Sequence, residues 1–262
     1  MKPTPHSTAG LAVDSYTSPV QMNRIASPNG RPQRTMPLLR KYEVAHLTPS
    51  LTIQEHSIMA PALPVFENAF ATFAHGTLLT TQTGLIAVED LLPGDQIKTK
   101  EYGFQSLLWH GAMTVTPTAP NGLPAQLVRI AAGAECYGAS GPDLVLGPAA
   151  RVRITTPYGE MLTGSRDVFI PAADRIDGQR FIGLAPRSAV QVYQIGFARH
   201  CSVVINGHEI ETLHPGPMHD LQLRPAMLDQ YLSLFGHVRT LADFGPMCAP
   251  RLRQADLDLA AA

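Results

Sequence analysis

The sequence predicts an all-β fold. From Gly76 to about Gly216, short runs of apolar and β-branched residues alternate with Gly, Pro, Asn and Asp, which form tight turns. No long segment of 3.6-residue periodicity interrupts this region, which argues against a parallel α/β sheet. Hydrophobic residues make up 45% of the 262 residues, enough for a large core. The expected strands are LIAVEDL, QIKTK, QSLLWHG, AQLVRIAA, DLVLG, RVRITT, EMLTG, DVFIPA, AVQVYQIGF and SVVING.

Residues 1–40 are expected to form a disordered arm. They are rich in Pro, Ser, Thr, Asn and Gln and contain few large apolar side chains. Such a composition cannot bury enough surface to offset the conformational entropy that ordering removes.

Residues 41–70 are expected to lead into the β-domain with a strand and a short helix. The stretch KYEVAHL alternates in the way typical of a half-buried strand. Pro61 and Pro64 are suited to the first turn of a helix. Spacings of four and three would place three aromatic rings on one face of that helix: Phe66, Phe70 and Phe73.

Residues 217–262 are expected to form a helical extension. Pro225 stands where helices often begin, and Met, Leu and aromatic residues recur at helical spacing up to Gly236. We interpret that stripe as a packing surface. The remainder is predicted to be a loop followed by a short terminal helix.

The near-neutral net charge and the absence of nucleotide-binding motifs argue against several functional classes. Twenty Lys and Arg against 21 Asp and Glu leave a formal net charge of -1, so no binding of nucleic acid or of an anionic membrane is expected. The pairs Arg40–Lys41 and Arg251–Arg253 are interpreted as solvated surface. Neither of the two common glycine-rich phosphate-binding motifs occurs. A protein partner remains possible and unidentified.

The cysteines and the apolar runs bear on cofactors and location. Cys136, Cys201 and Cys248 form neither a disulfide framework nor a C-x-x-C pair, so we expect no metal site and no cofactor. The two histidines beside a Pro-Gly-Pro turn, His214 and His219, lack a third ligand at a recognisable spacing. No apolar run approaches the roughly 18 residues of a membrane span, and no secretory signal is recognised. Cytoplasmic location is the default expectation, with signal-peptide-independent secretion left open.

Seven segments in order carry a family resemblance. They are FAHGTLL, GLIAVEDLLPGDQIKT, GFQSLLWHG, LVRIAAGA, PDLVLGPAARV, FIPAADRIDG and VYQIGFARHCSVVINGHEIETLHPG. Each segment is weak alone, but the ordered set resembles the Hint (hedgehog/intein) domain, and more narrowly the bacterial Hint-domain proteins common in alphaproteobacteria. The resemblance implies a flat disc of short strands with pseudo-two-fold symmetry over residues 71–216.

The resemblance also implies an ancestral self-processing reaction, and the residues that carry it are changed here. In active members a first-position Cys attacks the peptide bond before it, and a later His protonates the departing nitrogen. Here the nucleophile slot holds Thr72, and the general-acid slot holds Ala150 with Ala149 beside it. Gln194 stands where many members have His, and His200 matches a family His.

These departures predict a domain without efficient autoprocessing that acts as a binding or structural module. A threonine hydroxyl is essentially never ionised and needs a positioned base. Loss of a general acid removes a factor of about 10²–10⁴ in rate. With Thr72 and Ala150 in these slots, no catalytic residue is assigned.

The alternative is a self-processing domain that uses Thr72 for an N-to-O acyl shift and cleaves Ala71–Thr72, releasing about 71 residues. His75 and His200 are the candidate helpers. Their simpler interpretations are a solvent-facing residue in a turn and a hydrogen-bonded structural residue, while Thr72 would be a polar residue at a strand edge. A third possibility, an unrelated all-β enzyme, lacks any recognisable triad, metal motif or carboxylate pair.

Overall fold

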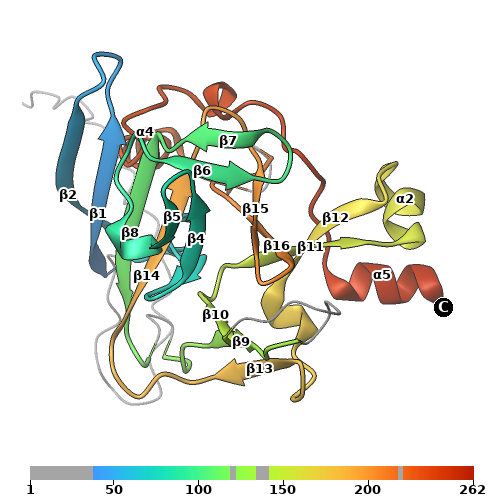
Figure 1. Ribbon diagram of the computed structural model, residues 1–262. Coiled ribbons are helices and arrows are strands. Elements are labelled where there is room, and N and C mark those ends of the chain that lie inside the picture. The colour runs from blue at the N-terminus through green and yellow to red at the C-terminus, as the bar shows by residue number, and fades with distance from the viewer. Residues whose placement is uncertain (1–37, 119–121, 134–141, 218–220) are drawn as a thin grey trace, which may run out of the picture. The chain divides into compact units, whose positions relative to one another are not determined.

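The expectation of a mostly β fold is confirmed. The computed structural model describes residues 38–118, 122–133, 142–217 and 221–262, and these form two antiparallel sheets with a few short helices (Figure 1). The segment expected to be disordered, residues 1–40, lies outside the described residues up to residue 37. At its end the prediction was wrong, because Leu39 and Arg40 form the start of a strand that pairs with residues 60 and 61.

The first sheet contains both the lead-in and part of the predicted domain. Its eight strands lie in the order β13 (Phe181–Leu184), β9 (Leu127–Ile130), β10 (Leu144–Leu146), β3 (Phe73–Ala74), β14 (Val190–Gly196), β8 (Trp109–Val115), β1 (Leu39–Leu47) and β2 (Ile53–Pro61). Strand β1 confirms the alternation seen in KYEVAHL and pairs with both β2 and β8. The lead-in is therefore continuous with the sheet that follows it in sequence.

The second sheet completes the β-structure. Its path is β12 (Asp167–Pro171), β11 (Arg151–Thr155), β16 (His208–Glu211), β15 (Ser202–Ile205), β6 (Gln96–Thr99), β4 (Leu78–Thr81) and β5 (Gly84–Ala87), with β7 (Gly103–Ser106) paired to β6. Neighbouring strands are antiparallel throughout.

The described residues also contain a few short helices. They are α1 (Pro64–Glu67), α2 (Pro157–Thr163), α4 (Pro225–Leu232), α5 (Gln254–Ala261) and three 3₁₀ turns at Val88–Asp90, Ala172–Arg175 and Leu241–Phe244. Helices α4 and α5 confirm a helical C-terminal extension. Helix α4 ends four residues before the predicted Gly236, because the amides of Leu234 and Phe235 bond to carbonyls only three residues back. None of the helices in the described residues is long and apolar enough to cross a bilayer.

Two helix and strand predictions were wrong. The stretch EMLTG belongs to helix α2, because Pro157 begins a helix well and Gly164 ends it in the left-handed conformation with φ of 78°. The lead-in helix stops at Glu67 instead of continuing through Phe73. Beyond it, the amide of Thr72 bonds to the carbonyl of Tyr193 in the sheet, so sheet pairing replaces further helical turns.

Two apolar clusters form the core. One lies among the strands of the domain and includes Phe73 and Phe181. The other is centred on Trp109, which is fully buried and donates its Nε1–H to the carbonyl of Leu234 at 2.8 Å. That second cluster also contains Tyr42, Phe70, Tyr231 and Phe235, so it joins the lead-in to the C-terminal extension.

Candidate functional site

The peptide bond in front of the nucleophile slot is held by backbone hydrogen bonds. The carbonyl of Ala71 accepts from the amide of Ala149 at 2.9 Å, and the amide of Thr72 donates to Tyr193 at 3.1 Å. The carbonyl of Thr72 accepts from the amide of Gly147 at 2.8 Å. Both residues of the bond are buried, and the described chain contains no cis peptide bond. The bond is therefore held between strand β14 and the turn that follows β10.

Gly147 packs directly against this bond. A Cβ at that position would lie 2.3 Å from the carbonyl oxygen of Ala71 and 2.6 Å from its carbonyl carbon. Real Cβ atoms do not approach backbone this closely, so only glycine allows the segment to reach the bond. The close approach of the general-acid segment to the slot bond depends on this residue.

The hydroxyl of Thr72 is engaged by an amide. Gln194 Nε2 donates to Thr72 Oγ1 at 2.7 Å, and Gln194 Oε1 accepts from the amide of Ile195 at 3.0 Å. These two bonds fix which end of the amide faces the hydroxyl. A neutral amide that donates to an oxygen cannot remove its proton, so Thr72 receives no general base from Gln194.

The general-acid slot carries no proton donor in its side chain. Ala150 is 1% exposed and packs in the first apolar cluster, and its amide and carbonyl are bonded to the backbone of Gly147 and Ala172. The Ala150 methyl group therefore packs in the core and cannot donate a proton to a departing nitrogen.

His75 is turned toward Glu89. Its side chain is 64% exposed, and its Nδ1 lies 3.3 Å from Glu89 Oε1. The same carboxylate accepts from the amide of Gly76 at 2.9 and 3.1 Å. The interaction stabilises the turn after β3, and the structure does not bring His75 to the Thr72 hydroxyl.

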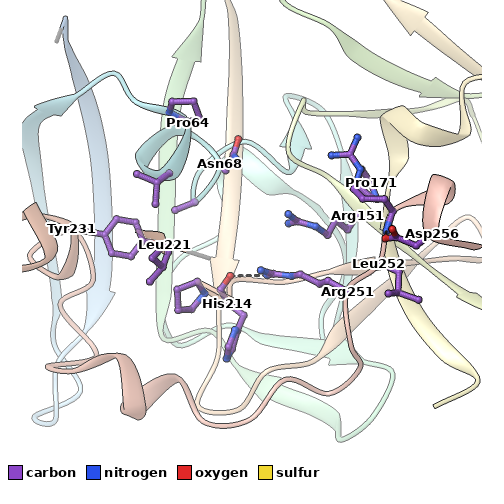
Figure 2. A pocket seen from close by; sticks show the side chains of 14 residues that line it. Pro64, Asn68, Arg151, Pro171, His214, Leu221, Tyr231, Arg251, Leu252 and Asp256 are labelled. Carbon is purple, nitrogen blue, oxygen red and sulfur yellow. Dashed lines mark hydrogen bonds between the residues drawn. The ribbon is translucent and has the colours of Figure 1, made fainter. Parts of the chain in front are cut away.

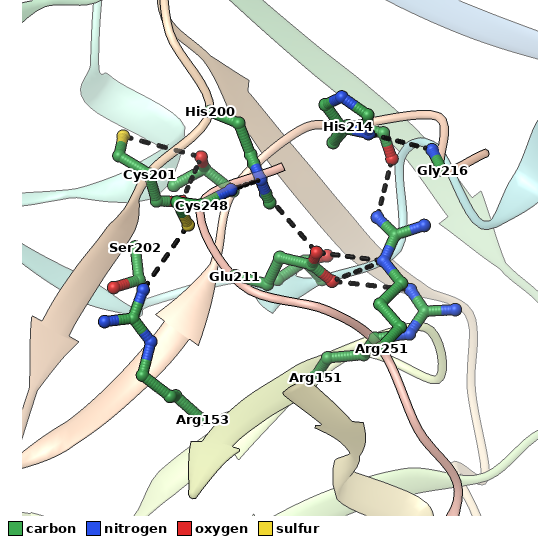
Figure 3. A network of polar contacts seen from close by, with 12 residues as sticks. Arg151, Arg153, His200, Cys201, Ser202, Glu211, His214, Gly216, Cys248 and Arg251 are labelled. Atoms are coloured by element: carbon green, nitrogen blue, oxygen red, sulfur yellow. Dashed lines mark hydrogen bonds and ion pairs between the residues drawn. The ribbon is translucent and has the colours of Figure 1, made fainter. Parts of the chain in front are cut away.

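His200 is fully buried in a different polar cluster (Figure 3). Its Nδ1 accepts from the amide of Cys248 at 3.0 Å, which assigns the ring proton to Nε2. Nε2 lies 3.3 Å from Glu211 Oε1. His200 thus bridges two chain segments and is engaged away from Thr72.

The pair His200–Cys201 does not form a thiol–imidazole site. The Sγ of Cys201 lies 3.6 Å from Thr212 Oγ1, and burial raises the pKa of this thiol to about 12. Burial raises the pKa of Cys248 to about 12 as well. Both thiols remain protonated at neutral pH and are poor nucleophiles.

Glu211 is the centre of the charged cluster, and no motif in the sequence marks it. Arg251 Nε donates to both carboxylate oxygens at 2.9 and 3.2 Å, and Arg151 Nη1 lies 3.6 Å away. Burial alone would raise the pKa of Glu211, but Arg251, His200 and Arg151 outweigh it and lower that pKa to about 2. The carboxylate stays ionised.

The prediction that Arg251 lies on a solvated surface was wrong. Its side chain is only 17% exposed, because Nη2 also donates to the carbonyl of His214 at 2.7 Å and the guanidinium is drawn inward to Glu211. The surface interpretation of Arg40 was wrong for a similar reason, since its side chain is 15% exposed and pairs with Glu67. Arg253, at 68% exposure, fits the prediction.

His214 belongs to the same cluster in its neutral form. Its Nδ1 accepts from the amide of Gly216 and its Nε2 faces the carbonyl of Gly245, both at 3.0 Å. Burial, together with the nearby charges of His200 and Arg251, lowers its pKa to about 4. His219 lies outside the described residues. Within the described part of the chain, no three His, Cys, Asp or Glu side chains are arranged to hold a metal ion.

Comparisons with known proteins identify the family of this chain. No curated protein matches the chain. Two solved structures resemble it: the bacterial intein-like domain from Clostridium thermocellum (15% identity, TM-score 0.38, 54% of this chain and 98% of that one) and a splice-inactive variant of the AceL NrdHF class 3 split intein (10% identity, TM-score 0.36, 55% and 97%). The family model of the Hint domain matches residues 71–217, more than half of the chain. The chain belongs to the Hint domain family.

Proposed function

We propose that this protein is a Hint domain that does not process itself efficiently and acts as a binding or structural module. The support comes from the side chains in the slots that active members use. Backbone hydrogen bonds hold the Ala71–Thr72 bond in place, while the nucleophile slot holds a hydroxyl group and the general-acid slot holds a methyl group. A folded scaffold with open cavities and without cleavage chemistry is suited to binding.

One observation carries this proposal. The hydroxyl of Thr72 accepts a hydrogen bond from Gln194 Nε2 at 2.7 Å. Attack on the preceding carbonyl would require a base to take the proton from Oγ1, and the group at that position is itself a donor. His75 and His200, the two imidazoles considered as substitutes, are paired with Glu89 and Glu211.

The second candidate is slow self-cleavage at Ala71–Thr72, and one observation favours it. The amide of Ala149 donates to the carbonyl oxygen of Ala71, as a donor of an oxyanion hole would. In that reaction Thr72 Oγ1 would bond to the carbonyl carbon of Ala71, the C–N bond would break, and the amide nitrogen would take a proton. The resulting ester would be open to hydroxylamine or water.

Intact mass spectrometry of the full chain separates the two candidates. The purified protein is incubated for days with and without hydroxylamine. The proposal predicts that the 28.3 kDa chain persists. Fragments ending at Ala71 and starting at Thr72, formed by the parent and absent from Thr72→Ala, would instead establish self-cleavage.

A complementary experiment restores the missing groups. Thr72→Cys combined with Ala150→His supplies a thiol and an imidazole at the two slots, and thiol-induced cleavage should become measurable. Thr72→Cys alone is the matched control, because it supplies the nucleophile without the acid. Since Ala150 is buried, the melting temperature of each variant is recorded to show that it is folded.

The lead-in is not expected to separate even if the bond is cut. Strand β1 pairs with both β2 and β8, and Phe70 and Tyr42 pack with Trp109 in the second core. A chain nicked at this bond should therefore elute as one species under native conditions. For this reason cleavage is measured by mass under denaturing conditions, and elution volume alone is insufficient.

A further inference from the structure

Two cavities among the described residues have volumes of about 490 and 500 Å³, in the range of small-molecule sites. The first lies between Tyr231 and Arg251 (Figure 2), and the guanidinium of Arg251 is bonded to Glu211, so its charge belongs to the cluster already described. The second is lined by strands β1, β2, β8 and β14 and by the 3₁₀ turn at Val88–Asp90. This second hollow is called the β1 cavity below.

The floor of the β1 cavity is a row of residues that face one another across four strands. The row consists of Ser57 on β2, Glu43 on β1, Ala112 on β8 and Tyr193 on β14. Directly opposed residues of an antiparallel sheet place their side chains on the same face. The short methyl group of Ala112 therefore lies between the long side chains of Glu43 and Tyr193, and this difference in length leaves the hollow.

The lining of the β1 cavity carries an excess of negative charge. It contains the carboxylates of Glu43, Glu55 and Glu89, and no Lys or Arg is found among the described residues that line it. Glu43 pairs with Lys41 at the surface, and Glu89 accepts the amide of Gly76. Glu55 has no hydrogen bond or ion pair in the described part of the chain. With Lys41 counted and the histidines neutral, two negative charges remain.

Tyr193 presents a hydroxyl that the protein does not use. The residue is only 8% exposed, yet its hydroxyl has no hydrogen-bond partner among the described residues and is not sealed from the cavity. Burial, and then the charges of Glu89, Glu43 and Asp90, raise the pKa of this hydroxyl above its ordinary value. A buried polar group without a partner is costly, so a ligand that bonds to it gains affinity.

The aromatic rings of the lining favour a cation that donates hydrogen bonds. His110 stacks on Tyr193, with ring centroids 5.6 Å apart and planes 21° apart, and so covers one face of that ring. Burial lowers the pKa of His110, and its Nε2 donates to the carbonyl of Val88 at 3.0 Å, so the imidazole adds no positive charge. A ligand would therefore meet the Tyr193 hydroxyl and the carboxylates, which suit a primary ammonium better than a quaternary one.

We propose that the β1 cavity binds a small aliphatic diamine, with one ammonium group on the Tyr193 hydroxyl and Glu89 and the other on Glu55. The inference rests on the proposed function, because it names the class of ligand that a non-processing Hint domain would bind. Gln194, the next residue of β14, points to the opposite face of the sheet and toward Thr72. The ligand would therefore lie on the other face of β14 from the nucleophile slot.

Probes of equal chain length test this on the unaltered full chain. Diaminopentane, pentylamine and the bis(trimethylammonium) analogue of diaminopentane are titrated by calorimetry and by ligand-observed NMR. Diaminopentane should bind at least about tenfold more tightly than either, because only it makes charge-assisted hydrogen bonds at both ends. No binding of diaminopentane, or equal binding of either comparison probe, would overturn the proposal. Tighter binding of N-acetyl-lysine amide would show that a protein lysine is the source of the amine and would overturn the assignment to a free diamine.

Two substitutions locate the binding. Glu55→Gln removes a charge without a partner in the protein and should weaken diaminopentane binding by about tenfold, whereas Glu160→Gln, at the exposed pair with Arg166, should change it less than about twofold. Tyr193→Phe should weaken binding by a similar factor and leave the midpoint of urea denaturation unchanged, because the hydroxyl bonds to no other group of the described chain. Unchanged binding in a folded Glu55→Gln or Tyr193→Phe would overturn the placement.

The intact mass of every sample is recorded in parallel. A chain cleaved at Ala71–Thr72 would mark a failure of the proposed function, whereas an intact chain that does not bind diaminopentane would mark a failure of this inference. The comparison of the probes needs no variant, so it decides the matter even if Glu55→Gln or Tyr193→Phe does not fold.

Discussion

The nucleophile slot and the Glu211 cluster are two buried polar regions of one domain with opposite chemistry. The slot contains a hydroxyl, an amide and a methyl group, from Thr72, Gln194 and Ala150. Around Glu211, by contrast, two guanidiniums and an imidazole surround a carboxylate. The peptide bond of the slot is held by backbone hydrogen bonds, and the side chains of the slot do not titrate near neutral pH.

This difference shows what the charged groups of the Glu211 cluster do in the fold. Arg251 comes from the C-terminal extension, whereas Glu211 and Arg151 belong to strands β16 and β11. His200 joins them through the amide of Cys248. The charges therefore fasten the extension to the sheet, and buried ion pairs of this kind are costly to break on one side.

The largest effect is expected from Glu211→Gln. The substitution keeps the shape but leaves Arg251 and Arg151 without their shared counter-charge, so the free energy of unfolding should fall by about 3 kcal/mol. Urea denaturation at pH 7 measures this. The control is Glu160→Gln, at an exposed ion pair with Arg166, which should cost less than about 1 kcal/mol. Equal effects would contradict the conclusion that the Glu211 cluster fastens the C-terminal extension to the sheet.

The next largest effect is a loss of stability in acid that is caused by protonation of His214. Its folded-state pKa of about 4 lies below the ordinary value of 6.5, so the unfolded chain takes up the proton first. Stability should therefore decrease as the pH falls from about 6.5 toward 4, by about 2 kcal/mol from this residue because it is only partly buried. Protonation would also place a hydrogen on Nδ1, against the amide of Gly216.

Urea denaturation at several pH values checks the contribution of His214. The slope of unfolding free energy against pH should be smaller in His214→Gln than in the parent. Burial also lowers the pKa of His237 to about 4, so His237 is protonated over the same pH range. His237→Gln is therefore the matched variant, which separates its contribution from that of His214. An unchanged slope in His214→Gln would contradict the prediction.

A smaller effect is expected from Gly147→Ala, which tests the shape of the slot. The new methyl group would meet the backbone of Ala71 at 2.3 Å, and backbone cannot move aside as a flexible side chain can. We expect a loss of about 1–3 kcal/mol. Gly183→Ala is the control, because its methyl group would meet the movable side chain of Gln126 at 2.6 Å and should cost less. Thermal unfolding of both variants compares them.

The strands could be predicted from the sequence because alternation and turn residues are local signals. Strand β1 followed from KYEVAHL, and most of the strands between Gly76 and Gly216 from similar runs. Helix α2 was missed because a short apolar run bounded by glycine fits either a strand or a helix, and Pro157 was the deciding residue. Strand β2 was not predicted either, since its exposed residues lack a clear alternation.

Candidate slot residues could be named from the sequence only where a local motif marked them. Thr72, Ala150 and Gln194 were located by their positions in motifs, and the hydrogen bond between Thr72 and Gln194 links residues 122 positions apart. The pairing of Glu211 with Arg251 spans 40 positions and two elements. Charged residues are usually exposed, so no rule of composition or spacing would have placed this pair in the interior.

The smallest effect is expected at the slot itself, from Thr72→Val. The substitution keeps the shape of the side chain and removes the acceptor of Gln194 Nε2, so the free energy of unfolding should fall by about 1 kcal/mol. Thr72→Ser retains the acceptor and should be closer to the parent in a urea titration. A loss as large as that of Glu211→Gln would mean that the slot hydroxyl is as firmly coupled to the fold as the charged cluster. The small loss predicted here follows from chemistry, because one neutral hydrogen bond contributes less than a buried carboxylate shared by two arginines.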